Sequence, residues 1–184
     1  ALAMMGFVKR TCIKFDDIQT FKMIFSSHIR SHIEYASLVW YPYLKTDCML
    51  IEKVQRRYSR FVLCHTMRID YEQLPTYELR CEILGLDTLE NRRKIACLMM
   101  VHDLLSGRLK CDYLCDKLTY RERRENARNH ELLVVQFHRT SYGQNEPVNV
   151  MIRLTNEVAS MYGPNVFSVN RHRFKDLVNG YFCN

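Results

Sequence analysis

The sequence predicts a mainly α-helical protein, folded as an irregular bundle of about six to eight helices. Apolar residues recur at three- and four-residue spacing along most of the chain, which is the period of a helix with one buried face. Helix breakers are scarce, with six glycines and four prolines in 184 residues. Only residues 132–137 read as a short strand or extended segment, so we expect at most one such element.

The first strongly periodic segment begins at Asp16, whose carboxylate can cap a helix that runs to about Trp40. Tyr41-Pro42 then ends it, because the residue before a proline avoids the helical region. Residues 1–10 read as the middle of a helix and do not begin with methionine. We therefore expect the chain to be part of a longer protein.

Two further helices follow. One begins near Thr46 or Asp47, and the next begins around Thr76 and stops at Gly85, a residue that readily takes the left-handed conformation of a helix end. The apolar face of the first of these two helices consists of Ile51, Val54, Tyr58, Phe61 and Val62.

A capping signal at residues 87–90 predicts a long helix through about Ser106, which Gly107 ends. A short helix is expected at 111–118. Residues 121–130 are charged and lack large apolar side chains, which is typical of a loop or a solvated arm.

The C-terminal part begins after a polar turn at 141–146. Pro147 suits the first position of a helix through about Ser160, because its missing N–H has no helical partner there anyway. Gly163-Pro164 ends that helix, and a last helix covers roughly 171–181. The chain is therefore predicted to contain a helical bundle at 1–118, a basic arm and extended loop at 119–146, and C-terminal helices at 147–184 that pack on the bundle.

The chain is basic, with 27 Lys and Arg against 20 Asp and Glu, a formal net charge of +7 and a pI of about 9.0. This balance favours anionic partners such as nucleic acid, although it also fits ordinary solubility. No apolar run is long enough to span a bilayer, so we expect no membrane partner. The eight scattered cysteines do not resemble a secreted disulfide framework, which predicts an intracellular protein.

The most informative surface feature is a basic stripe, defined as Lys53, Arg56, Arg57 and Arg60. Their spacing of i, i+3, i+4 and i+7 places them on one helix face, largely opposite the apolar face. Such a face suits a phosphate backbone, and the alternative is a solvated face. Solvated faces usually mix both signs of charge, whereas Glu52 is the only acid in the middle of this helix.

Two other basic groups are weaker candidates. Arg92 and Arg93 begin a capped helix, where cations oppose the helix dipole, so they either mark an outside anion or have no functional meaning. The charged arm suits contacts to RNA or DNA backbone, and equally a disordered loop. Its candidate residues are Arg121, Arg124 and Arg128.

No catalytic or metal site is recognisable. Phe15-Asp16-Asp17 lacks the residue that separates the aromatic from the aspartates in a polymerase motif, and it reads as a helix cap. The spacing of Cys111 and Cys115 is not a standard zinc pattern. We therefore expect no metal or cofactor in this chain.

Several segments, taken in order, resemble one family, the reverse transcriptases of jockey-like non-LTR retrotransposons. The resemblance is to the C-terminal part of these enzymes and covers Met5 to about Glu157, with the run Val54–Arg57 after Val39-Trp40 the most specific part. The segments are GFVKR (6–10), IEYASLVWYP (33–42), IEKVQRRYSRF (51–61), LPTYELR (74–80) followed by LGL (84–86), ENRR (90–93) and RENAR (124–128).

The resemblance implies a thumb-like bundle that follows the polymerase palm, with the catalytic aspartates located before Ala1. The family's activity is RNA-directed DNA synthesis with Mg²⁺, so Mg²⁺ is expected for the parent polymerase and not for this chain. Implied partners are the missing palm region and an RNA or DNA duplex, and the implied location is the nucleus and cytoplasm.

We therefore hypothesise a nucleic-acid-binding portion of a reverse transcriptase that grips template–primer duplex or element RNA through the basic stripe. We expect no primer extension by this chain alone. The alternative is a helical protein-interaction module that docks on the palm or on another partner. Its apolar docking surface would consist of Leu2, Met4, Met5, Phe7 and Val8.

Overall fold

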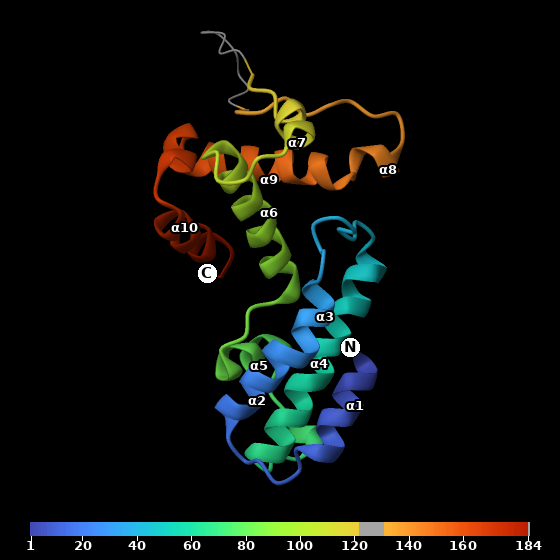
Figure 1. Ribbon diagram of the computed structural model, residues 1–184. Coiled ribbons are helices and arrows are strands. Elements are labelled where there is room, and N and C mark those ends of the chain that lie inside the picture. Colours follow the sequence, from blue (N-terminus) through green and yellow to red (C-terminus); the bar gives the residue numbers. More distant parts are fainter. Residues whose placement is uncertain (122–130, 184) are drawn as a thin grey trace. The chain divides into compact units, whose positions relative to one another are not determined.

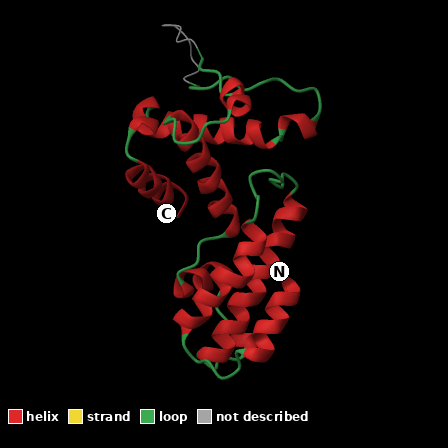
Figure 2. Ribbon diagram, viewed as in Figure 1, coloured by secondary structure: helices red, strands yellow, loops and turns green. Residues whose placement is uncertain are grey.

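The computed structural model describes residues 1–121 and 131–183, and it is mainly helical (Figures 1 and 2). This confirms the predicted fold class, a mainly α irregular bundle. The described residues form no strand. The expected extended segment contributes one isolated antiparallel bridge, between Tyr120 and Leu133.

The chain divides into two compact units. The first unit contains Ala1–Ser37 and Pro42–Arg92, and the second contains Leu38–Tyr41 and the residues from Arg93 onward. The division falls inside helix α6 (Leu89–Leu105). The predicted segment 1–118 therefore includes all of the first unit and the start of the second.

The first unit is built around its longest helix. That helix, α4 (Lys45–Thr66), packs against α1 (Leu2–Thr11), α2 (Ile18–Ile24) and α5 (Tyr77–Leu84), and the hydrophobic side chains of these helices form one core (Figure 1). The core side chains with no exposed surface are Phe21, Phe25, Ile29, Leu63 and Leu89. The elements of the unit before α6 are α1 (Leu2–Thr11), α2 (Ile18–Ile24), the π-helix η1 (Phe25–Arg30), α3 (Ser31–Glu34), α4 (Lys45–Thr66), the 3₁₀-helix η2 (Tyr71–Gln73) and α5 (Tyr77–Leu84).

The helix predicted from Asp16 to Trp40 has different ends in the structure. Asp17 is the cap, because its Oδ2 accepts a hydrogen bond of 2.8 Å from the backbone N–H of Thr20. The helical run α2–η1–α3 ends at Glu34, since Ala36 takes a positive φ of 49° that a right-handed helix does not permit.

Other predicted helix boundaries are confirmed where a local signal sets them. The Thr76 side chain caps α5, and Gly85 ends that helix with a φ of 56°. Thr88 caps α6 through a hydrogen bond of 3.2 Å from the N–H of Asn91, and Gly107 follows the end of that helix with a φ of 70°.

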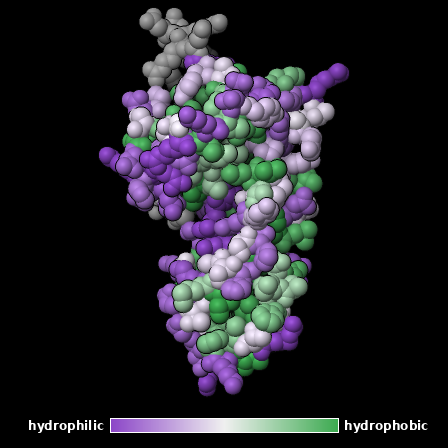
Figure 3. All heavy atoms as spheres, viewed as in Figure 1, coloured by the Kyte–Doolittle hydropathy of each residue, from purple (hydrophilic) through white to green (hydrophobic). Residues whose placement is uncertain are grey.

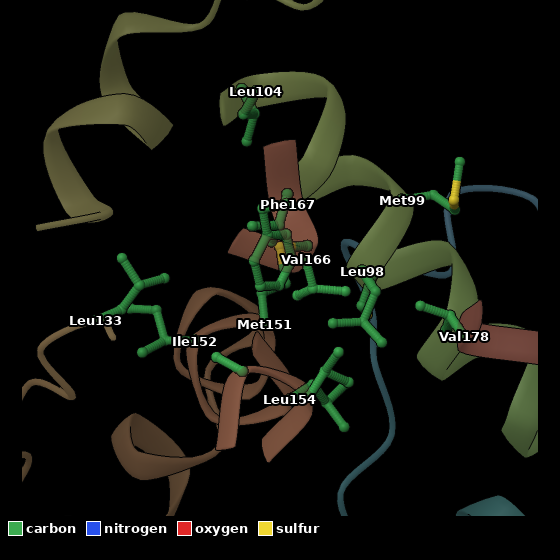
Figure 4. Close-up of a cluster of buried hydrophobic side chains, with 14 of the residues drawn as sticks. Leu98, Met99, Leu104, Leu133, Met151, Ile152, Leu154, Val166, Phe167 and Val178 are labelled. Atoms are coloured by element: carbon green, nitrogen blue, oxygen red, sulfur yellow. The ribbon is translucent and has the colours of Figure 1, made fainter. Parts of the chain in front are cut away.

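The second unit has a separate hydrophobic core, formed by side chains of α6, α9 (Pro147–Tyr162), the 3₁₀-helix η3 (Pro164–Ser168) and α10 (Arg171–Cys183) (Figure 4). Pro147 and Arg171 begin helices as predicted, and the turn expected at 141–146 contains a one-turn helix. No helix of the described residues has the length and hydropathy needed to cross a membrane. The elements after α6 are α7 (Asp112–Lys117), α8 (Ser141–Gln144), α9 (Pro147–Tyr162), the 3₁₀-helix η3 (Pro164–Ser168) and α10 (Arg171–Cys183).

A buried asparagine on α9 holds the extended segment in place. The Asn156 Oδ1 accepts a hydrogen bond of 2.8 Å from the N–H of Leu133, and its Nδ2 donates one of 2.9 Å to the carbonyl of the same residue. Leu133 has no exposed surface, so its backbone groups have no access to water. The asparagine amide thus supplies the partner that a neighbouring strand would otherwise provide.

Replacing this amide tests its structural role. We expect Asn156→Ala to lower the free energy of unfolding by about 3 kcal/mol, because one donor and one acceptor of Leu133 then lie buried without partners. Urea unfolding followed by circular dichroism measures the change. Gln136→Ala, at an exposed position of the same segment, is the control. A loss in Asn156→Ala no larger than in this control would contradict the prediction.

Candidate nucleic-acid interface

The structure brings the four residues of the basic stripe together on the first unit. Helix α4 buries Val54, Tyr58 and Val62 on its core side. On its other side, the side chains of the stripe are exposed or partly exposed. They line an open groove with a volume of about 640 Å³, which we call the basic groove. The members of the stripe are Lys53, Arg56, Arg57 and Arg60.

The basic groove combines cations with apolar and aromatic side chains. Lys9 reaches it from α1, and Tyr71 reaches it from η2. No acidic residue of the described chain lines it. A concave surface with five cations and no acid concentrates positive potential and attracts anions. The remaining lining residues are Met5, Phe61 and Cys64.

The charges of the stripe are not neutralised within the described parts of the chain. None of the four cations forms an ion pair there, and the nearest acid in sequence, Glu52, has other partners. Its Oε1 accepts hydrogen bonds from the Tyr77 hydroxyl and, at 3.2 Å, from the N–H of Leu89 at the start of α6. The mixed charge of an ordinary solvated face is therefore missing.

Tyrosines hold two of the arginines without cancelling their charge. The guanidinium of Arg56 lies over the ring of Tyr77, 4.6 Å from its centroid. That of Arg60 lies 5.5 Å from the ring centroid of Tyr71 and donates a hydrogen bond of 2.7 Å to the hydroxyl. Cation–π contacts limit the motion of a side chain while its charge stays available, which lowers the entropy lost on binding.

Sequence reasoning missed two cations in or behind this groove. Lys9 lies on a different helix, and its Nζ is 5.2 Å from the ring centroid of Phe61 on α4. Arg80 lies behind α4 and is 4% exposed, with its Nε donating to the Ser59 hydroxyl at 3.1 Å. Burial, and then the nearby charge of Arg60, lower the pKa of Arg80. No spacing along α4 could have indicated either residue, because packing between helices places Lys9 in the groove and Arg80 behind it.

The other predicted site residues do not line the groove. Arg92 pairs with Glu34 through two nitrogens and with Asp87 at 3.9 Å, and the hydrogen bond to Glu34 raises its pKa. Arg93 is 2% exposed, and no described residue accepts a hydrogen bond from its guanidinium. Arg121 pairs with Glu131 at 2.5 Å. Two further candidates, Arg124 and Arg128, lie outside the described residues.

The apolar residues of α1 that were predicted to form a docking surface do not form one exposed surface in the structure. Met5 and Val8 are buried in the core of the first unit, and Met4 packs partly against it. Leu2 and Phe7 remain 49% and 54% exposed. The visible face of this unit carries hydrophobic and hydrophilic side chains side by side (Figure 3).

The two aspartates that were compared with a polymerase motif have partners within the first unit. The Asp17 carboxylate accepts hydrogen bonds from the backbone and the hydroxyl of Thr20, which lower its pKa. Asp16 lies 3.7 Å from His65. Within 1–121 and 131–183, no three His, Cys, Asp or Glu side chains gather as a metal site, and Cys111 and Cys115 are free thiols.

No protein-family model, curated protein or solved structure matches the chain.

The hydrogen bond from the Tyr77 hydroxyl to Glu52 makes the free energy of unfolding fall at alkaline pH. Burial, and then the hydrogen bond to Glu52, raise the pKa of Tyr77 above its ordinary value near 10. The neutral phenol is thus favoured in the folded state. Its contribution to stability is complete below about pH 10 and is lost as the pH rises further.

Tyr77→Phe removes this dependence. Between about pH 9 and about pH 11, we expect the urea midpoint of the wild-type protein to fall by more than that of the variant. Urea titrations at several pH values provide the measurement. Tyr142→Phe, at an exposed tyrosine, should behave as the wild type does. An equal fall in wild type and Tyr77→Phe would refute the assignment.

Proposed function

We propose that the first unit binds the phosphate backbone of nucleic acid through the basic groove. One observation carries this proposal: four unpaired cations of α4 and Lys9 of α1 line one groove that contains no described acid. The sequence resemblance supports a more specific form of it. In that form, the chain is the thumb-like C-terminal part of a reverse transcriptase related to those of jockey-like non-LTR retrotransposons, and it grips template–primer duplex or element RNA.

The dimensions of the stripe suit a phosphate backbone. Arg60 lies seven positions after Lys53, and a helix rises about 1.5 Å per residue, so the stripe extends about 10 Å. Successive phosphates of one duplex strand advance about 3.4 Å along the axis, so this length spans about three of them. Contacts of this kind fix position and orientation without reading bases. The proposed grip is therefore independent of sequence.

In this role the chain carries out no chemical step itself. In the parent polymerase, Mg²⁺ would be held by the palm, and the chain described here would keep the duplex aligned with it. The missing palm is then a second partner of the chain.

Removing the stripe tests the proposed interface. Log affinity for a duplex should fall with log salt, and we expect the four residues of the stripe to contribute about −3.6 to this slope, as four phosphate contacts require. Replacing Lys53, Arg56, Arg57 and Arg60 by Gln should weaken binding about 100-fold at low salt and flatten this slope. Fluorescence anisotropy of a labelled duplex and of a labelled single-stranded RNA measures both quantities.

A matched control separates a specific groove from net charge. Lys14, Lys45, Arg139 and Lys175 are also exposed cations without an ion pair to a described residue, and they lie outside the groove. Their replacement by Gln removes the same number of charges and should weaken binding far less. Equal losses in the two variants, or a flat salt response of the wild type, would reject the proposal.

Lys9 provides a second test, because only the packing of α1 places it in the groove. We expect Lys9→Gln to make the salt slope shallower by about 0.9, the amount that one phosphate contact contributes. Lys14→Gln, an exposed position just after α1, serves as the control with no change in slope. Should both variants keep the wild-type slope, the bound backbone does not reach α1.

A further inference from the structure

A second cavity lies within the second unit and has a volume of about 520 Å³. The last turn of α6, the residues just after it, and the segment from η3 to the first residue of α10 line it. Its volume is typical of small-molecule sites, which measure roughly 300 to 1,000 Å³. The cavity is separate from the basic groove, which belongs to the first unit.

A buried histidine with one unsatisfied nitrogen lines this cavity. His102 is 2% exposed, and its ring stacks on Phe174 with the centroids 4.7 Å apart. Its Nε2 lies 2.9 Å from the carbonyl oxygen of Val169, which can only accept, so Nε2 carries a proton. Nδ1 has no hydrogen-bond partner among the described residues, and its distance of 3.8 Å from Asp103 is too long for one. A fixed, buried nitrogen without a partner points to a ligand.

Arg108 gives the cavity a free positive charge, and Arg171 adds one free hydrogen-bond donor. Arg171 binds Asp103 through Nε at 2.9 Å and Nη2 at 3.2 Å, which leaves Nη1 without an acceptor in the described chain. Arg108 is exposed and forms no ion pair with a described residue. Asp103 itself does not line the cavity, nor does any other described acid. An anionic group can therefore enter without meeting a carboxylate.

The start of α10 adds donors to the same wall. Asn170 caps this helix by accepting a hydrogen bond of 3.1 Å from the N–H of His172. The N–H of Arg171 has no acceptor among the described residues. Helix N-termini attract phosphate groups, because their free N–H groups and the helix dipole point at the ligand. The C-terminal end of α6 also lines the cavity, and free carbonyl groups there would repel an anion. The carbonyls of His102, Asp103 and Leu104 already accept backbone hydrogen bonds, so this repulsion is small.

We infer that this cavity binds a phosphate monoester. The phosphate lies against Arg108, Arg171 and the first N–H groups of α10, within reach of His102. Near neutral pH a phosphate monoester is partly protonated, so it can donate a hydrogen bond to Nδ1 of His102. The cavity is larger than a phosphate ion, and Tyr120 and Phe167 add aromatic surface for the organic part of the ligand.

Titrations with small phosphates test this inference on the whole chain. The probes are inorganic phosphate, glycerol phosphate and a nucleoside monophosphate, added at constant ionic strength. The nitrogen NMR resonances of His102 should shift saturably with both esters, with a Kd of about 1 mM or lower. The tighter ester identifies the source of the phosphate as a polyol phosphate or a nucleotide. No saturable shift with either ester would overturn the proposal.

Matched variants locate the binding site. Arg108→Gln should weaken binding of the tighter ester about tenfold, because it removes one charged hydrogen-bond donor. Lys110→Gln removes an exposed cation two residues away, outside the cavity, and should leave binding unchanged. Equal effects of the two variants would overturn the site. The variant without the basic stripe should bind the ester as wild type does, so this result is independent of the proposed nucleic-acid interface.

Discussion

The rotation of α4 about its own axis is the constraint on which the first unit depends. Tyr58 sets it from the core side, because its ring stacks on Phe25 at 4.6 Å and its hydroxyl donates a hydrogen bond of 2.7 Å to the carbonyl of Phe21. A side chain that is 1% exposed and anchored at both ends leaves the helix little freedom to turn. The basic stripe must then face away from the core, where its charges stay hydrated and accessible.

Tyr58 also contacts the backbone of α2, close to the point where that helix changes to the π-helix η1. The Phe21 carbonyl accepts a hydrogen bond from the N–H of Phe25 as well as from Tyr58, and the π-helix η1 begins at this point. This contact joins residues far apart in the sequence, so helical periodicity predicted one regular helix there and could not predict η1 or the early end at Glu34.

Local signals made other parts of the structure predictable. Thr76, Gly85 and Pro147 act through their own backbone or side chain, and the helices begin and end beside them as expected. The basic stripe was predictable because i, i+3, i+4 and i+7 spacing is a property of any helix. The rest of the groove was not, since Lys9 and Tyr71 reach it from other elements and only long-range packing brings them to α4.

The difference between the stripe and Arg92 shows what decides whether a cation is available to a ligand. The stripe and the Arg92-Arg93 pair both lie in arginine-rich helix segments of the sequence. Arg92, however, forms a two-nitrogen ion pair with Glu34, which a ligand would have to displace. Arg56 instead meets the ring of Tyr77, which restrains it without supplying a negative charge. Glu52, the acid that could have neutralised the stripe, is held by the Tyr77 hydroxyl and the start of α6. Tyr77 therefore serves the groove twice, because it orients one arginine and also binds the carboxylate nearest to the stripe in sequence.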